Sequence, residues 1–327
     1  MLVDNHNRTI NYLRLAVTDR CNLRCNYCMP SEGINFAAND KLFTIEELSR
    51  LSQIMVNQGI NKIRITGGEP FVRKDLMVLL RDLSEMKGLD DISITTNATL
   101  IGPYIDELKA LGIKNINVSM DAITKETFET ITRRNQYDIV YENIIRLITE
   151  GFKVRINFIA LEGQNTDDII PMLDLAKHFD VCVRFLEEMP FNGGSKSFNT
   201  ITWDYKHILA HIAEVYPKYY QLESPKTSTS INYKIPGFAG SFGIIPSFSR
   251  TFCGSCNRLR ISATGDVITC LYAKASTNLL TVLRATNSEE KVKEYILKAI
   301  GSRAKTGFEA QQEYKDVFSN SMTSIGG

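Results

Sequence analysis

Between residue 12 and about residue 189, short apolar segments rich in β-branched residues alternate with longer segments of helical periodicity. This alternation predicts an α/β fold in which βαβ units build a parallel sheet. Successive right-handed crossovers leave two architectures open, a doubly wound sheet or an incomplete barrel. We expect six strands, each followed by a helix, at residues 13–17, 62–66, 91–95, 116–120, 153–159 and 181–186.

The sequence predicts both boundaries of the first expected helix. Thr44 and Glu47 have the spacing of a capping box, in which each side chain accepts a hydrogen bond from the other residue's backbone N–H. Gly59 is a typical stop signal, because glycine readily adopts the left-handed conformation that ends helices. We therefore expect the helix to lie between these two points.

The pattern changes after about residue 190, where a Gly- and Ser-rich stretch at 192–197 leads into shorter helical and strand-like segments. Residues 259–262 and 267–271 flank a four-residue turn and predict a β-hairpin. We interpret residues 1–190 as an incomplete (βα)6 TIM-type barrel, because the motifs below follow its strand ends. Residues 191–327 are then a smaller region of short strands and helices that closes the barrel.

Charge and cysteine content restrict the function. Lys and Arg total 38 and Asp and Glu total 37, so the formal net charge is +1, which argues against a general nucleic-acid binder. We see no export signal and no run of about 18 apolar residues, so we expect no membrane association. Seven cysteines, three of them within eight residues, favour metal or redox chemistry in a reducing compartment, and we expect a cytoplasmic protein.

Cys21, Cys25 and Cys28 form a CxxxCxxC motif directly after the first expected strand. Loops at this end of the strands carry the active site in α/β barrels. Three thiolates can hold one metal centre and leave a coordination position open, whereas structural zinc normally takes four protein ligands. The motif therefore indicates a reactive metal centre.

The segment RLAVTDRCNLRCNYCMP, residues 14–30, is similar to the signature of the radical S-adenosylmethionine (SAM) superfamily, and in particular of its GTP 3′,8-cyclase family, the molybdenum cofactor biosynthesis A proteins. The resemblance implies that the three cysteines hold a [4Fe–4S] cluster whose fourth iron binds SAM. It implies SAM contacts in ITGGEP, after the second strand, and at later strand ends. These expected SAM-binding residues are Tyr27, Gly68, Glu69, Ser119 and Met189. One departure is Ala98, where the family usually has glycine.

Cys253, Cys256 and Cys270 form a second triad, in which the expected hairpin returns the third cysteine to the first two. A zinc ribbon would need a fourth ligand, and the remaining thiol, Cys182, lies in an apolar strand where we expect a buried structural role. The stretch FCGSCNRLR resembles the C-terminal motif of the same family. The resemblance implies a second [4Fe–4S] cluster whose open iron contacts the guanine of GTP.

Basic residues on the expected strands are a third signal. Arg258 and Arg260 alternate along a strand, which places both guanidinium groups on one face, where they suit a polyphosphate. Buried charge on barrel strands requires either an anionic occupant or internal carboxylates. The resemblance implies GTP contacts at Arg14, Lys62, Arg64, Thr95, Arg155, Arg184, Arg258, Leu259 and Arg260. It implies catalytic roles for Arg14, Arg258, Arg260 and the C-terminal pair Gly326 and Gly327.

The resemblance implies a lyase that converts GTP to (8S)-3′,8-cyclo-7,8-dihydroguanosine 5′-triphosphate in the first step of molybdenum cofactor biosynthesis. Besides GTP, the expected partners are an external electron donor and a downstream cyclic pyranopterin monophosphate synthase, with a homodimer as an option. Two alternatives stay open here. One is a radical SAM peptide-modifying enzyme with an auxiliary cluster, and the other is a non-catalytic iron–sulfur or zinc sensor.

Overall fold

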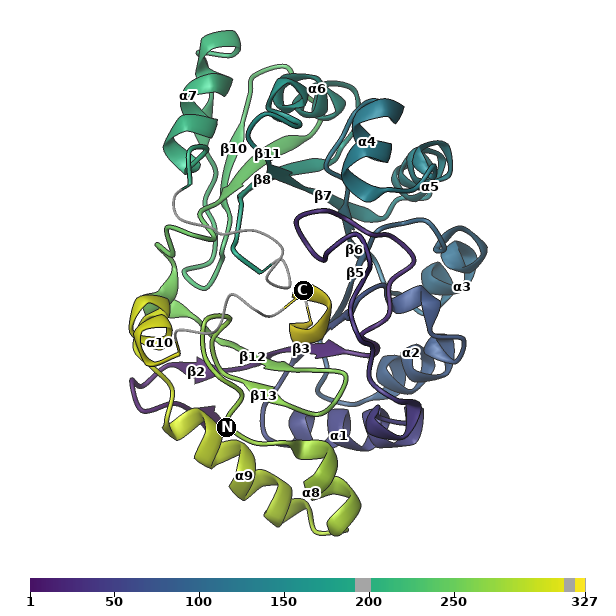
Figure 1. Cartoon of the computed structure of the whole chain (residues 1–327), viewed down its shortest axis with the longest axis vertical. Helices are drawn as coiled ribbons and strands as arrows, with labels where there is room; N and C mark the ends of the chain where they lie inside the picture. Colours follow the sequence, from purple (N-terminus) through teal and green to yellow (C-terminus); the bar gives the residue numbers. More distant parts are fainter. Residues whose placement is uncertain (192–200, 315–320, 327) are drawn as a thin grey trace.

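The computed structural model of the chain describes residues 1–191, 201–314 and 321–326. At its centre lies a curved sheet, which Figure 1 shows surrounded by helices. The strands of this sheet are β3 (Tyr12–Ala16), β4 (Lys62–Thr66), β5 (Asp91–Thr96), β6 (Asn115–Ser119), β7 (Lys153–Ala160), β8 (Cys182–Glu187), β9 (Tyr220–Gln221), β10 (Ile231–Lys234), β11 (Ser241–Ile245), β12 (Arg258–Ile261) and β13 (Val267–Ile268). Their order in the sheet is β13-β12-β3-β4-β5-β6-β7-β8-β11-β10-β9.

Strands β3 to β8 lie side by side in chain order, and each pairs in parallel with the next. The six strands expected from the sequence are confirmed, with every boundary within one residue. The helices that connect them lie outside the curved sheet (Figure 1), which is the arrangement of a barrel and not of a doubly wound sheet. The incomplete barrel is therefore confirmed.

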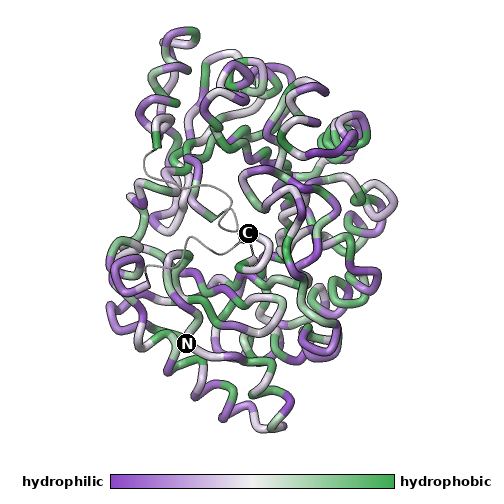
Figure 2. Tube along the Cα trace, in the orientation of Figure 1, coloured by the Kyte–Doolittle hydropathy of each residue, from purple (hydrophilic) through white to green (hydrophobic). Residues whose placement is uncertain are grey.

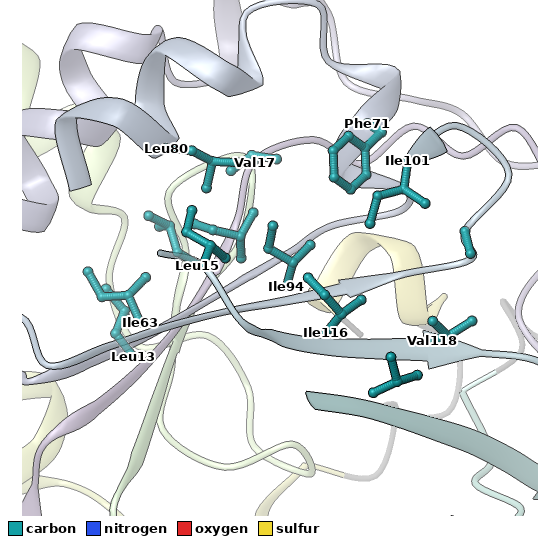
Figure 3. Close-up of a cluster of buried hydrophobic side chains, with 14 of the residues drawn as sticks. Leu13, Leu15, Val17, Ile63, Phe71, Leu80, Ile94, Ile101, Ile116 and Val118 are labelled. Atoms are coloured by element: carbon teal, nitrogen blue, oxygen red, sulfur yellow. The ribbon is translucent and has the colours of Figure 1, made fainter. Parts of the chain in front are cut away.

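Helices between the strands cover the outer face of the sheet. They are α1 (Ile45–Asn57), α2 (Leu76–Glu85), α3 (Ile105–Ala110), α4 (Lys125–Thr132), α5 (Tyr137–Thr149) and α6 (Ile169–His178), with short 3-10 turns at Asn39–Lys41, Pro70–Val72, Gly102–Tyr104 and Thr166–Asp168. Hydrophobic and hydrophilic residues alternate along them (Figure 2). Figure 3 shows how Leu15, Ile63 and Ile94 from the strands pack near Leu80 of α2. All four side chains are fully buried, and each such burial contributes about 1.5–3 kcal/mol.

The boundaries expected for the first helix are confirmed in α1. The Thr44 hydroxyl accepts a hydrogen bond from the Glu47 N–H at 3.2 Å, and the Glu47 carboxylate accepts one from the Thr44 N–H at 2.8 Å. Gly59 follows the helix with a φ of +99°, the left-handed conformation expected of a stop.

The later part of the chain extends both edges of the barrel sheet. β12 pairs in parallel with β3, and β11 pairs in parallel with β8. The expected hairpin is confirmed as the antiparallel pair β12 and β13, although its second strand is shorter than expected. Strands β9, β10 and β11 form an antiparallel ribbon at the other edge. Strands from both sides of residue 190 thus share one sheet, and the two-region division remains a prediction.

The remaining elements lie around and inside this sheet. They are the hairpin of β1 (Leu2–Val3) and β2 (Thr9–Ile10), the 3-10 turn Cys253–Ser255, and the helices α7 (Tyr205–Val215), α8 (Leu279–Ala285), α9 (Glu289–Gly301), α10 (Gly307–Glu313) and α11 (Met322–Ile325). Figure 1 shows α11 within the ring of the sheet. Among the described residues, we find no helix with the length and apolar character needed to cross a bilayer.

Ala98 adopts a left-handed backbone, with a φ of +61°, in the turn after β5. Its methyl group is fully buried. Left-handed backbone costs an L-residue roughly 1–2 kcal/mol, which offsets the roughly 1–2 kcal/mol that glycine loses through chain entropy and the missing methyl. We therefore expect Ala98→Gly to change the free energy of unfolding by less than about 0.5 kcal/mol.

The matched control is Ala176→Gly in α6, since Ala176 is equally buried but helical. It should lose about 2 kcal/mol in the same urea titrations, from helix propensity and burial together. Equal losses for the two substitutions would mean that the turn after β5 carries no strain.

Candidate active site

A cavity of about 720 Å³ runs along the inner face of the sheet. Lys62 and Cys182, the first residues of β4 and β8, line one end, and Gly68 and Met189, which follow those strands, line the other. Among the expected site residues, those that line this cavity are Arg14, Cys21, Cys25, Tyr27, Cys28, Lys62, Arg64, Gly68, Thr95, Ser119, Arg155, Arg184, Met189, Cys253, Cys256, Arg258, Arg260 and Cys270. One space thus joins both cysteine triads, the expected SAM segment and the basic residues.

The Glu69 carboxylate does not line the cavity, although we expected it to bind SAM. It is fully buried and accepts hydrogen bonds from the Thr96 hydroxyl at 2.7 Å, the Asn97 N–H at 2.6 Å and the Phe71 N–H at 3.1 Å. Burial raises its pKa to about 7. In this arrangement Glu69 holds the end of β5 beside the Gly67–Gly68 turn.

Two other expected site residues, Leu259 and Gly326, are also absent from the cavity lining. The Leu259 side chain is fully buried in the core, because it lies on the opposite face of β12 from Arg258 and Arg260. The Gly326 carbonyl accepts a hydrogen bond from the Thr66 hydroxyl at 3.3 Å. Gly327 lies outside the described residues.

The first cysteine triad sits in the loop after β3. Within the loop, the Cys28 N–H donates to the Cys25 carbonyl at 3.0 Å. The guanidinium of Arg133, which follows α4, donates to the loop carbonyls of Arg24 and Met29 at 3.0 and 3.2 Å and so ties the loop to the end of that helix. Burial, followed by the charge of Glu69, raises the pKa of Cys21 to about 11. Burial thus favours the protonated form of this thiol, and a metal that binds it would release the proton.

The pKa values of the other two thiols of this triad are also raised. Burial, followed by repulsion from Cys21, raises the pKa of Cys28 to about 12. The pKa of Cys25 is raised well above its ordinary value by burial and by the neighbouring Cys28 and Asp121. A segment from the other end of the chain covers the loop, since the Ser321 hydroxyl donates to the Cys28 carbonyl at 2.8 Å.

Tyr27 is anchored by a carboxylate that the sequence did not single out as a binding group. Its hydroxyl donates to Asp121 Oδ2 at 2.6 Å, and Asp121 Oδ1 accepts from the Ile159 N–H at 2.7 Å. Burial raises the pKa of Asp121 to about 6. Between its unfolded value near 3.8 and about 6, the folded protein holds more protons than the unfolded chain, so stability is lost as the pH rises.

Asp121→Asn tests this linkage, because asparagine carries no charge, its Oδ1 can accept from the Ile159 N–H, and its Nδ2 can donate to the Tyr27 hydroxyl oxygen. We expect its free energy of unfolding to gain roughly 3 kcal/mol relative to the original protein between pH 4 and pH 7. Urea titrations at several pH values measure the difference. A constant difference would show that Asp121 ionises normally in the folded chain.

The second triad receives hydrogen bonds from several donors. The Arg303 guanidinium donates to Cys256 Sγ at 2.9 Å, Arg258 donates to the same sulfur at 3.8 Å, and the Gly307 N–H donates to Cys253 Sγ at 3.4 Å. Burial would raise the pKa of Cys256, but these guanidinium groups outweigh it and lower the pKa. Burial raises the pKa of Cys270.

All seven cysteines are free thiols. In the part of the chain that the structure describes, no three Cys, His, Asp or Glu side chains are arranged to hold a single metal ion. Each triad offers three thiols that line the cavity, with no fourth protein ligand among the described residues. That donor set fits an iron–sulfur cluster with one open iron.

The basic residues leave the cavity strongly positive. Lys62 forms an ion pair with Asp91, but no described carboxylate lies within ion-pair distance of Arg64, Arg184, Arg258 or Arg260. The Nε atoms of Arg184 and Arg260 are buried without a hydrogen-bond partner in the described residues. Burial, followed by repulsion from Arg64, lowers the pKa of Arg184 to about 9. Buried arginines need either carboxylate partners or an anionic ligand. Since no described carboxylate pairs with these four, an anionic ligand in the cavity is the explanation that fits.

Several residues that line the cavity carried no expected role. Cys182, expected to be structural, lines it beside Arg184. Tyr12, two residues before Arg14 on β3, could have been found from the same period-two rule. Arg303 could not, because it lies in a short turn after α9 where no periodicity places its side chain.

Comparison with known families gives two matches along the chain. Residues 15–176 match the radical SAM superfamily, and residues 181–308 match the molybdenum cofactor synthesis C family. A GTP 3′,8-cyclase from Syntrophomonas wolfei is 38% identical, and the match covers 92% of this chain and 93% of that protein. A mitochondrial GTP 3′,8-cyclase from Arabidopsis thaliana is 35% identical, covering 100% of this chain and 84% of that protein.

Other relatives are longer, or more distant. Molybdenum cofactor biosynthesis protein 1 from Dictyostelium discoideum is 40% identical over 92% of this chain, which spans 48% of that protein. The chain therefore covers about half the length of several curated relatives. Among solved structures, Streptococcus suis SuiB bound to precursor peptide SuiA has a TM-score of 0.64 at 17% identity, covering 91% of this chain and 68% of that one. This likeness concerns the fold alone.

Proposed function

The chain belongs to the GTP 3′,8-cyclase family of the radical SAM superfamily, and we propose that it converts GTP to (8S)-3′,8-cyclo-7,8-dihydroguanosine 5′-triphosphate in molybdenum cofactor biosynthesis. The observation that carries the proposal is that one cavity joins two cysteine triads and a set of buried guanidinium groups. Membership of the superfamily implies a [4Fe–4S] cluster and SAM.

The first triad would hold the SAM-binding cluster. Its three thiols would hold the cluster and leave a position for SAM. Tyr27, Gly68, Ser119 and Met189 line the same cavity, which supports their expected contacts with SAM. When bound, the cluster and SAM supply a radical able to remove a hydrogen atom from an unactivated C–H bond. Glu69 would act indirectly, through the β5 end that its hydrogen bonds hold.

The second triad would hold a second [4Fe–4S] cluster that positions the guanine of GTP. Support comes from its three thiols, which line the same cavity as the first triad. The chain's part in the reaction is to fix the ribose between the two centres, because a reactive radical attacks whichever C–H bond is nearest.

The buried arginines would bind the triphosphate. Arg184 and Arg260 have Nε donors without described partners, and Arg64, Arg258 and the expected Arg14, Lys62 and Arg155 line the same space. A phosphate oxygen that accepts these donors would remove the repulsion among the guanidinium groups. Thr95 offers a hydroxyl that has no described hydrogen-bond partner, at the end of β5.

The C-terminal segment would help to exclude water from the site. α11 lies inside the ring of the sheet (Figure 1), and the Gly326 position is tight, since a Cβ there would meet the Ala16 Cβ at 3.0 Å. We assign Gly326 and Gly327 catalytic roles, as the family resemblance implies.

The external electron donor, the downstream cyclic pyranopterin monophosphate synthase and a homodimer remain predictions. So does a cytoplasmic location, which the seven free thiols support, because disulfides persist mainly in oxidising compartments. Neither the peptide-modifying enzyme nor the sensor is favoured by a specific observation.

Anaerobic incubation of the reconstituted protein with SAM, dithionite and GTP tests the proposal. We expect methionine, 5′-deoxyadenosine and a product with the mass of GTP, because the hydrogen atom lost at C3′ is replaced by an electron and a proton. ATP in place of GTP is the control. If SAM were cleaved while GTP remained unchanged, the proposed function would be wrong.

A further inference from the structure

Arg303 makes a close contact with the second cysteine triad that no expected role explains. It lies in the turn after α9, and its side chain is 4% exposed. Its Nη2 atom donates to Cys256 Sγ at 2.9 Å, and its Nη1 atom donates to the Cys256 carbonyl at 3.1 Å. Both arms of the guanidinium fork therefore hold one cysteine.

The N-terminal hairpin fixes this guanidinium from behind. Asp4 has a fully buried carboxylate, which lies 3.5 Å from Arg303 Nη1 and 2.7 Å from Arg8 Nε. Arg8 in turn donates to the Cys253 carbonyl at 3.0 Å and to the Lys305 carbonyl at 2.8 Å. Asp4 and Arg8 thus tie the turn that carries Arg303 to the loop that carries the triad.

The first triad has no counterpart to this arrangement. Uncharged groups donate to its sulfur atoms, among them the Asn97 amide, 3.7 Å from Cys21 Sγ, and in the described residues no guanidinium donates to them. The reduction potential of an iron–sulfur cluster depends on its charge and on the hydrogen bonds to its sulfur atoms. Reduction adds a negative charge, which a charged N–H donor stabilises.

We propose that Arg303 is a positioning residue that raises the reduction potential of the second cluster, and that Asp4 holds its guanidinium against Cys256. The inference rests on the proposed function in one respect, because it requires that the second triad binds a cluster. It assigns to Arg303 a role that is separate from binding GTP.

The test is a redox titration of the two-cluster protein, followed by electron paramagnetic resonance, with SAM added to identify the signal of the first cluster. We expect Arg303→Gln to move the midpoint potential of the second cluster to a more negative value and to leave the first unchanged. Arg303→Lys keeps the charge without the fork and should give a smaller shift. Asp4→Asn loosens the guanidinium but also removes a negative charge, two effects that oppose each other, so it should shift the potential less than Arg303→Gln does.

The matched control is Arg284→Gln, which removes an equal charge from a surface ion pair with Glu47 and should shift neither potential. An unchanged second potential in Arg303→Gln would overturn the inference. If that variant does not retain the cluster, Arg303→Lys decides in the same way. A protein that binds only one cluster before any substitution would instead contradict the proposed function, so the two failures are distinguishable.

Discussion

Replacing Cys25 with alanine is expected to remove the first cluster and to reduce SAM cleavage by more than about 100-fold. The reason is that Cys25 would be a direct ligand, whereas loss of a group that only orients a ligand already costs about 10–100-fold. Iron analysis of the anaerobically reconstituted protein should show half the iron of the original chain. Liquid chromatography of 5′-deoxyadenosine measures the cleavage.

Cys182→Ala is the matched control, since Cys182 also lines the cavity but belongs to neither triad. It should retain the iron of both clusters. Full iron content and undiminished SAM cleavage in Cys25→Ala would mean that the first triad does not hold the SAM-binding cluster.

Replacing Arg184 with methionine is expected to change ligand binding and stability in opposite directions. A charge-assisted hydrogen bond contributes about 1.5–3 kcal/mol, so GTP affinity should fall roughly 10- to 100-fold. Without a ligand, however, the buried charge of Arg184 destabilises the folded protein, as its lowered pKa indicates. Removing it should raise the free energy of unfolding by roughly 1–3 kcal/mol, even after the 2.6 Å hydrogen bond to Asn117 is lost.

Equilibrium GTP binding and urea unfolding measure the two effects. Arg81→Met is the control, because Arg81 is about half-exposed and pairs with Glu107 at the surface, where an ion pair contributes only about 0–1 kcal/mol. It should leave GTP affinity unchanged. Loss of stability in Arg184→Met, with GTP affinity retained, would indicate a structural role for Arg184 and not a phosphate site.

The barrel could be predicted from the sequence because its strands are local features. β3 to β8 are buried segments separated by helical segments, and that alternation reports their burial directly. The edge strands could not be placed in the same way. β11 and β12 join the sheet beside β8 and β3, which are far away along the chain, and no local pattern encodes such pairing.

Likewise, the parts of the candidate site that depend on local sequence could be predicted, and those that depend on tertiary contacts could not. Cys21, Cys25 and Cys28 are close in sequence, so their motif was readable, and residues at strand ends follow from the barrel geometry. The partners of the Glu69 carboxylate could not be predicted, because its direction depends on which N–H and O–H groups surround it after folding. Its contact with SAM stays a prediction. Arg303 was missed for the same reason, since its contact with Cys256 spans 47 residues.

The most direct test of the proposed function uses GTP that carries deuterium at C3′, incubated anaerobically with the reconstituted protein, SAM and a reductant. Mass spectrometry of the 5′-deoxyadenosine then reports where its new hydrogen came from. We expect one deuterium in 5′-deoxyadenosine and a product that has lost the label. Unlabelled 5′-deoxyadenosine, formed while deuterated GTP is recovered intact, would contradict the proposed function.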